Sequence, residues 1–132
     1  MEAAFRGYFH TDEVALSEKL QAIKLWVFDW DGVFHSGQKD TQGNSTFNEV
    51  DSMGLNLLRF AYYLHRNETV PFVIVTGTQN PTAVAFAERE NFDGVYMGAK
   101  NKLQVLAFLC EKYELAPQEV AFAFDDVLDI SM

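Results

Sequence analysis

Hydrophobic residues along this chain form two kinds of pattern, and each kind predicts a different element. Four short apolar runs, rich in β-branched and aromatic residues, are typical of strands that are covered on both faces. They span residues 25–28, 72–75, 95–97 and 120–124, and the third is the weakest. Elsewhere the apolar residues recur at intervals of three and four, which predicts helices between these strands.

The predicted helices are defined by their apolar stripes and by their starts. The first spans residues 12–22, the second spans 52–65, and the third begins at Pro81 after a capping Asn80. The stripes are Leu16, Leu20 and Ile23 in the first helix, Met53, Leu57, Phe60, Ala61 and Leu64 in the second, and Leu103, Leu106, Ala107, Cys110 and Tyr113 in a fourth. The polar stretch 35–46 predicts a loop or a small solvated hairpin.

Strands that alternate with helices imply parallel pairing through right-handed crossovers. We therefore predict a three-layer, Rossmann-like α/β fold with a mostly parallel central sheet. A chain of 132 residues is long enough for one compact domain. We assign residues 1–24 to an N-terminal extension that carries a helix and residues 25–132 to the core.

The net charge of the chain disfavours some classes of binding partner. A formal net charge of −9 disfavours nucleic acid and anionic membranes, because both would repel an acidic protein. An anionic substrate would need a local cation, either a metal or a well-placed lysine. The single cysteine, Cys110, cannot form an internal disulfide, and residues 1–10 lack the pattern of a signal peptide. We therefore expect a soluble cytoplasmic protein.

Carboxylates and small polar residues follow three of the predicted strands. Asp29 and Asp31 follow the first, Thr76 and Gly77 the second, and Asp125 and Asp126 the last. Because the carboxyl ends of parallel strands lie at one edge of a sheet, we expect these residues to converge. A lone aspartate at a strand end is more often a turn former or a helix cap, but clustered carboxylates need a counter-ion. Hard oxygen ligands favour Mg²⁺.

These motifs resemble, in order, those of the haloacid dehalogenase-like (HAD) phosphatase superfamily. The matching residues are Asp29-Trp30-Asp31-Gly32-Val33, Thr76-Gly77, Lys102, and Asp125-Asp126 with Asp129. A looser likeness, at Phe47, Asn48, Asp51 and Gly54, is to the capless branch that includes 3-deoxy-manno-octulosonate 8-phosphate phosphatase and related sugar-acid phosphatases. The resemblance implies a phosphomonoester hydrolase without a large cap.

The resemblance also implies a role for each residue. Asp29 would be the nucleophile and Asp31 the general acid and base. Thr76 and Gly77 would hold the phosphoryl group, and Lys102, preferred to its rival Lys100, would neutralise charge on nucleophile and phosphate. The implied Mg²⁺ ligands are Asp29, the Asp31 carbonyl and Asp125, supported by Asp126 and Asp129.

The sequence also departs from the family pattern. Phe124 stands where glycine usually precedes the last aspartate pair, Thr78 where arginine is common, and Val50 where the sugar-acid branch tends to carry a basic residue. Family members continue past the last motif with a further strand and helix, whereas this sequence stops at Ile130-Ser131-Met132. We therefore expect either that this is a truncated form of a longer protein or that a partner, such as a homo-oligomer, covers the flank of strand 120–124, which would otherwise be exposed.

Two functions remain open on these grounds. The first is a Mg²⁺-dependent phosphatase that hydrolyses a small phosphorylated metabolite, of the sugar or sugar-acid class, through an aspartyl phosphate. The second is a catalytically degenerate domain of the same fold, a binding or oligomerisation module that binds metal or a partner but turns over slowly or not at all. A signalling receiver is disfavoured, because its acceptor aspartate is not normally followed by Asp31. Closure of Asp29, Asp31, Lys102 and Asp125 around one Mg²⁺, with an anion opposite it, would favour the enzyme. An empty site with Lys102 turned away would favour the binding module.

Overall fold

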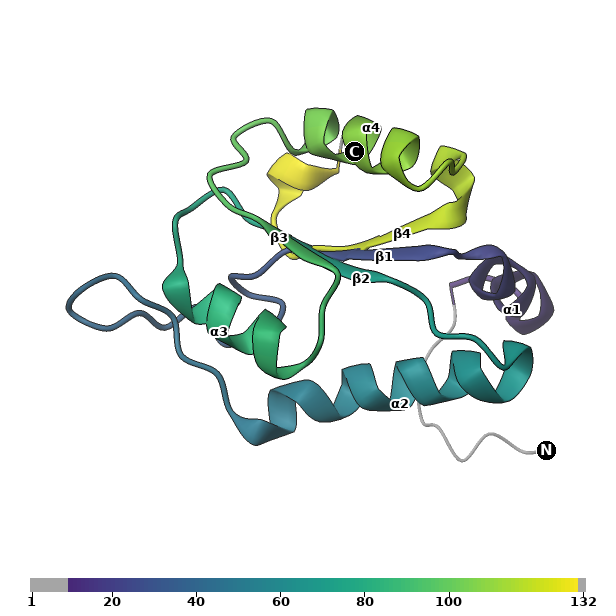
Figure 1. The fold of residues 1–132 in the computed structure, drawn as a ribbon, viewed down its shortest axis with the longest axis horizontal. Helices are drawn as coiled ribbons and strands as arrows, with labels where there is room; N and C mark the ends of the chain where they lie inside the picture. The colour runs from purple at the N-terminus through teal and green to yellow at the C-terminus, as the bar shows by residue number, and fades with distance from the viewer. Residues whose placement is uncertain (1–9, 131–132) are drawn as a thin grey trace.

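The computed structural model describes residues 10–130, which form a parallel four-stranded sheet between two layers of helices (Figure 1). The strands are β1 (Leu25–Phe28), β2 (Phe72–Val75), β3 (Gly94–Tyr96) and β4 (Val120–Ala123), and their order is β3-β2-β1-β4. This arrangement confirms the predicted three-layer α/β fold. The boundaries of β3 and β4 differ from the predicted ranges by one residue.

Within residues 10–130, four α-helices and two short 3₁₀ helices precede, connect or follow the strands. They are α1 (Glu13–Ala22), α2 (Glu49–Arg66), α3 (Pro81–Arg89), α4 (Lys102–Lys112), η1 (Pro117–Glu119) and η2 (Val127–Asp129). Helices α2 and α3 cover one face of the sheet and α4 covers the other (Figure 1). The predicted start of α3 is confirmed, because the Asn80 side chain accepts a hydrogen bond from the Thr82 amide and Pro81 is the first helical residue.

The core divides into two clusters, because successive side chains of a strand point to opposite faces of the sheet. On the side of α2 and α3 the buried residues include Phe28, Phe72, Ile74, Leu55, Tyr62 and Phe86. On the side of α4, Leu109 packs with Leu25, Val27, Val73 and Val75. Trp30, the residue between the two aspartates after β1, is fully buried in the first cluster.

Helix α2 differs from its prediction in its start and in the position of its apolar stripe. It begins at Glu49, three residues before the predicted start, after the N-cap Asn48. Its buried residues are Ser52, Leu55 and Tyr62. The predicted stripe, represented by Leu57 at 68% exposure, lies on the outer side instead. The spacing therefore identified the helix but not its buried face.

Two further predictions of burial were wrong. In α4 the fully buried residue is Leu109, which is not in the predicted stripe, whereas Leu103 of that stripe is 51% exposed. Strand β4, which was predicted to be buried, is only half-buried. It is an edge strand of the described sheet and pairs only with β1. Phe124 lies beyond the strand and is exposed. The chain end after Ile130 and residues 1–9, on which other expectations rested, lie outside the described residues.

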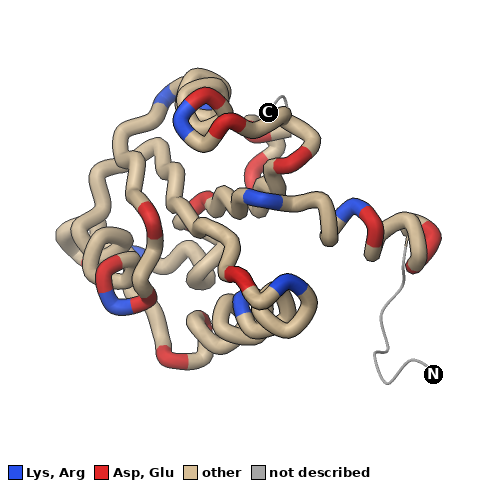
Figure 2. Tube along the Cα trace, turned by 45° about the vertical axis from the view of Figure 1, so that its right-hand side comes forward, with Lys and Arg blue, Asp and Glu red and all other residues tan. Residues whose placement is uncertain are grey.

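The polar stretch between β1 and α2 forms the small hairpin that was one of its two predicted forms. Lys39 and Ser45 form an isolated antiparallel bridge. The Asp40 carboxylate closes the turn by accepting hydrogen bonds from the amides of Gln42 and Asn44. Figure 2 shows that lysines and arginines are dispersed among acidic residues along the described trace. Between residues 10 and 130, no helix combines the length and the apolar character that a bilayer crossing needs.

Candidate active site

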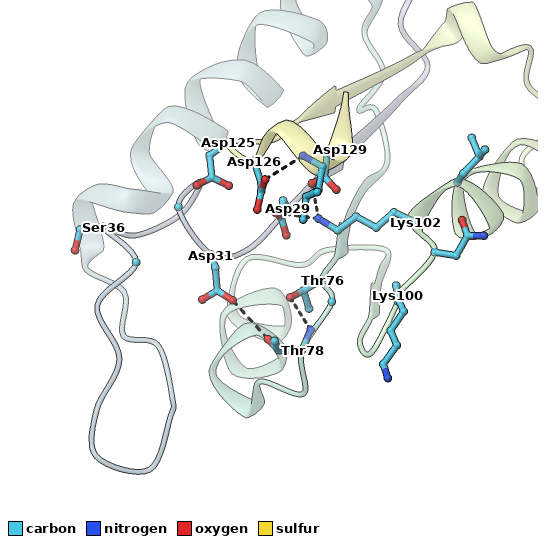
Figure 3. A pocket seen from close by; sticks show the side chains of 17 residues that line it. Asp29, Asp31, Ser36, Thr76, Thr78, Lys100, Lys102, Asp125, Asp126 and Asp129 are labelled. Carbon is cyan, nitrogen blue, oxygen red and sulfur yellow. Dashed lines mark hydrogen bonds and ion pairs between the residues drawn. The ribbon is translucent and has the colours of Figure 1, made fainter. Parts of the chain in front are cut away.

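The carboxyl ends of β1, β2 and β4 open onto a cavity of about 760 Å³ (Figure 3). Strand register brings these ends level, since Phe28 of β1 lies opposite Ile74 of β2 and Ala123 of β4. The cavity lining includes all the residues that the sequence put forward: Asp29, Asp31, Thr76, Gly77, Lys102, Asp125 and Asp126. The structure therefore brings the predicted site residues together at one edge of the sheet.

Lys102 pairs with two buried carboxylates in this cavity. Its Nζ lies 2.9 Å from Asp29 Oδ2 and 2.5 Å from Asp129 Oδ2. Asp29 Oδ1 also accepts a hydrogen bond from the Trp30 amide at 2.7 Å. Lys102 is the first residue of α4, directly after the N-cap Asn101. The position of the helix start therefore fixes the backbone from which the Lys102 side chain extends. Lys100 also lines the cavity, but its side chain is exposed and Lys102 is the lysine that reaches Asp29.

Burial and ion pairing have opposite effects on the pKa values of Asp29 and Lys102. Burial raises the pKa of Asp29, and the hydrogen bonds from Lys102 and the Trp30 amide offset only part of that effect. Burial also opposes the charge on Lys102, but hydrogen bonds to Asp129 and Asp29 outweigh it and raise the pKa of Lys102. Lys102 therefore stays cationic and supplies positive charge beside Asp29.

Asp31 is held by side chains from two segments, the polar stretch 35–46 and the residues after β2. Its carboxylate lies 2.7 Å from Ser45 Oγ, 3.2 Å from Lys39 Nζ, 3.1 Å from His35 Nε2 and 3.5 Å from Thr78 Oγ1. Burial alone would raise the pKa of Asp31, but the hydrogen bonds from Ser45 and Lys39, together with the charge on Lys39, lower it. The carboxylate is therefore ionised in the resting site.

Sequence reasoning missed most of these partners of Asp31. It placed His35 in a loop without a role, and the four-residue spacing from Asp31 was the only available signal. It assigned no role to Lys39 or Ser45, which lie in a polar stretch without a motif. The departure at Thr78 puts a hydroxyl beside Asp31 in place of the arginine that the family pattern favours.

A buried pair of polar residues orients the Ser45 contact. Ser45 is fully buried, and its Oγ accepts a hydrogen bond from Asn80 Nδ2 at 2.9 Å. Asn80 Oδ1 already accepts from the Thr82 amide as the cap of α3, which turns Nδ2 toward Ser45. Because the Ser45 oxygen receives this hydrogen, its own hydrogen is available to Asp31. The start of α3 is thereby linked to the Asp31 carboxylate.

The residues after β2 present both side-chain and backbone groups to the cavity. Thr76 is buried, and its amide donates to the Tyr96 carbonyl at 2.9 Å, so this amide is occupied within the sheet region. Its hydroxyl accepts a 3.5 Å contact from the Thr78 amide. Gly77 is exposed at the cavity and carries no side chain that could block the approach of an anion.

The oxygen donors of the site match the preference of Mg²⁺. Asp125 lies against Gly32, where φ is +80° and an added β-carbon would fall 2.0 Å from Asp125 Oδ2. The Asp125 carboxylate has no hydrogen-bond partner among the described residues, whereas Asp126 caps η2 by accepting from the Leu128 amide. As the side chains stand in residues 10–130, no three acidic, histidine or cysteine residues are close enough together to hold a metal. The all-oxygen donor set and the unpaired Asp125 nevertheless fit a hard cation.

Comparison with known proteins agrees with the fold and with the motifs. No protein-family model matches the chain. The curated 3-deoxy-D-manno-octulosonate 8-phosphate phosphatase of Escherichia coli (strain K12) is 27% identical over 115 residues, which is 84% of this chain and 57% of that protein. The chain therefore spans little more than half the length of the curated relatives that it matches.

Solved structures give the same result. A Legionella pneumophila hydrolase assigned to the HAD superfamily (subfamily III A) is 28% identical, with a TM-score of 0.72 over 90% of this chain and 65% of its own. A Moraxella catarrhalis 3-deoxy-D-manno-octulosonate 8-phosphate phosphatase, in complex with magnesium, phosphate and KDO, is 24% identical, with a TM-score of 0.75 over 91% of this chain and 67% of its own. In sequence and in fold, the chain resembles the phosphatases of the haloacid dehalogenase-like superfamily.

Proposed function

We propose that this chain is a Mg²⁺-dependent phosphomonoester hydrolase that acts through an aspartyl phosphate on a small phosphorylated sugar or sugar acid. The observation that carries the proposal is the 2.9 Å pairing of Lys102 with Asp29 in a cavity that also holds Asp31. A degenerate binding module would not need this buried lysine beside the nucleophile position. The name of the curated relative supports the sugar-acid substrate class.

In this proposal Asp29 attacks the phosphorus, and the leaving alcohol takes a proton from Asp31. Water then attacks the aspartyl phosphate and gives a proton to Asp31. The resting, ionised Asp31 suits the second step as it stands, and it must be protonated before the first. Lys102 neutralises the phosphoryl oxygens throughout, while Thr76 and Gly77 border the phosphate position.

A divalent cation belongs to the same proposal. Asp29, the Asp31 carbonyl and Asp125 would hold Mg²⁺, with Asp126 beside them, while Asp129 acts through its contact with Lys102. When bound, the ion supplies positive charge to the phosphoryl oxygens. Its charge would also favour the ionised form of Asp29, which burial alone disfavours.

The proposal is tested by phosphate release from a panel of sugar phosphates, sugar-acid phosphates and an aryl phosphate. We expect release that requires Mg²⁺, stops when EDTA removes the metal and returns when Mg²⁺ is added in excess. The strongest substrate in the panel would identify the class. Folded protein that releases no phosphate from any member at saturating Mg²⁺ would contradict the proposal and favour the binding module.

Ser45→Ala is expected to lower kcat for sugar phosphates about tenfold while KM stays unchanged, because one hydrogen bond to the charged Asp31 is lost. An aryl phosphate has a good leaving group that needs little protonation, so its kcat should fall much less. Steady-state kinetics on both substrates measure the difference, and Ser17→Ala on α1 is the matched control. Equal losses on the two substrates would contradict a role that acts through Asp31.

A further inference from the structure

The side chain of His35 lies buried beside Asp31, and the reaction as proposed gives it no role. Only 5% of this side chain is exposed, and the centre of its ring lies 5.4 Å from that of the fully buried Trp30. Its Nε2 atom lies 3.1 Å from Asp31 Oδ1. Burial of a polar ring is costly unless its hydrogen-bonding groups are used, so both nitrogens of this ring need a partner.

The Gly37 amide determines which nitrogen of the His35 ring carries the hydrogen. This amide donates a hydrogen bond to His35 Nδ1 at 3.0 Å, so Nδ1 is an acceptor and carries no hydrogen itself. The hydrogen of the neutral ring is therefore on Nε2, the atom that lies beside Asp31. Gly37 has a φ of +80°, a backbone conformation that favours glycine, so the turn that presents this amide is built into the sequence.

The hydrogen on His35 Nε2 has no well-aligned acceptor among residues 10–130. Asp31 Oδ1 is within 3.1 Å, but the N–H bond does not point straight at it. An unpaired buried donor costs free energy, and a hydrogen bond to a charged acceptor is stronger than one to a neutral acceptor. A small turn of the Asp31 carboxylate therefore gains a hydrogen bond. Catalytic hydrogen bonds often reach their best alignment only when the substrate is bound.

The two carboxylate oxygens of Asp31 have different surroundings. Oδ1 faces the Nε2 atom of His35 and the Oγ atom of Ser45, and both of these side chains are buried. Oδ2 instead contacts Lys39 Nζ, on a side chain that is 38% exposed, and Thr78 Oγ1 at the longer distance of 3.5 Å. Figure 3 shows the contact between Asp31 and Thr78 at the cavity. Buried groups thus hold Oδ1, whereas Oδ2 is the oxygen that can change partners.

We propose that His35 is a positioning residue for Asp31, whose Oδ1 accepts a hydrogen bond from Nε2 of the neutral ring while Oδ2 transfers the proton. The inference rests on the proposed phosphatase reaction. In the first step Oδ2 gives its proton to the leaving oxygen as the bond between that oxygen and phosphorus breaks. In the second step water bonds to phosphorus and loses a proton to Oδ2, while the bond between phosphorus and the Asp29 oxygen breaks. His35 exchanges no proton in either step.

Two substitutions of His35 separate hydrogen bonding from packing. His35→Phe keeps a ring against Trp30 but has no donor, whereas His35→Gln offers an amide N–H in place of Nε2. With a sugar phosphate, we expect His35→Phe to lower kcat about tenfold at unchanged KM and His35→Gln to recover most of the loss. With an aryl phosphate, whose leaving group needs little protonation, His35→Phe should lower kcat much less. His65→Phe, at an exposed histidine of α2 outside the cavity, is the matched control and should change neither rate.

Steady-state kinetics at saturating Mg²⁺ distinguish the possible results. Equal losses in His35→Phe and His35→Gln would indicate that the side chain acts only by packing, and would overturn the proposal. Equal losses on the sugar phosphate and the aryl phosphate would also overturn it, because the effect would then not pass through the proton of Asp31. Wild-type protein that releases no phosphate from any substrate would instead contradict the proposed function, and the role of His35 with it.

Nuclear magnetic resonance tests the position of the ring hydrogen without any turnover. The chemical shifts of the two ring nitrogens distinguish a hydrogen on Nε2, a hydrogen on Nδ1 and a ring that carries both. We expect His35 in the wild-type protein to carry its hydrogen on Nε2, with its signals identified by their loss in His35→Gln. A hydrogen on Nδ1 in the folded protein would overturn the proposal, whether or not the protein is active.

Discussion

Asp29→Asn is expected to lower Mg²⁺-dependent phosphate release by about 10³-fold or more, because an amide cannot form the covalent intermediate. The substitution preserves the size of a buried side chain and keeps an acceptor for the Trp30 amide. Burial disfavours the charged form of Asp29, and Lys102 keeps its ion pair with Asp129, so the neutral amide should cost less unfolding free energy than the removal of Lys102. Steady-state phosphate release and urea unfolding on the same preparation measure the two effects.

The matched control for this variant is Asp40→Asn. Asp40 is exposed and bonds within its own loop, so its substitution should change neither activity nor Mg²⁺ dependence. Folded Asp29→Asn protein that kept wild-type turnover would exclude Asp29 as the nucleophile. That result would point to another acid in the cavity, or to direct attack by water.

Lys102→Met is expected to have the largest effect on stability. It removes the cation that lies between Asp29 and Asp129, and both carboxylates are 7% exposed. Removing one partner of a buried ionic group while the opposite charge remains costs about 3–5 kcal/mol of unfolding free energy. Urea unfolding at pH 7 measures the loss, and phosphate release should disappear with it.

The pH dependence separates this explanation from a loss of packing. Without Lys102 the two buried carboxylates should bind protons more tightly in the folded state than in the unfolded state. Protonation then relieves the unpaired charge, so the destabilisation should shrink as the pH falls from 7 toward about 4. Lys100→Met, at an exposed lysine of the same cavity, should cost less than about 0.5 kcal/mol. A loss for Lys102→Met that stays constant with pH would contradict the electrostatic account.

Local patterns in the sequence were sufficient for the elements and for the fold class. The runs 25–28 and 72–75 coincide with β1 and β2. A short, continuously apolar segment between polar turns buries all its side chains only as a strand in a sheet that is covered on both faces. Asn80 followed by Pro81 marked the start of α3, since both residues act through the backbone next to them. Parallel topology then placed Asp29, Thr76 and Asp125 at one edge of the sheet.

These local patterns could not predict contacts between segments that lie far apart in the sequence. Ser45 meets Asp31 across 14 positions of the chain, and Asp129 meets Lys102 across 27. Neither pair has a spacing rule, because the path of the intervening loop or the order of the strands decides whether the two side chains meet. The same holds for β4, whose half-buried state follows from its place at the edge of the described sheet.

Helix α2 separates what the sequence determined from what the tertiary structure decided. Periodicity in the sequence determined that a helix forms here and that Met53, Leu57, Phe60 and Leu64 share one side of it, because the helical repeat depends only on the backbone. Which side faces the sheet was decided by tertiary packing, where Leu55 and Tyr62 fit the core and those four residues do not. Burial is a property of neighbouring elements, so only the assembled layers settle it.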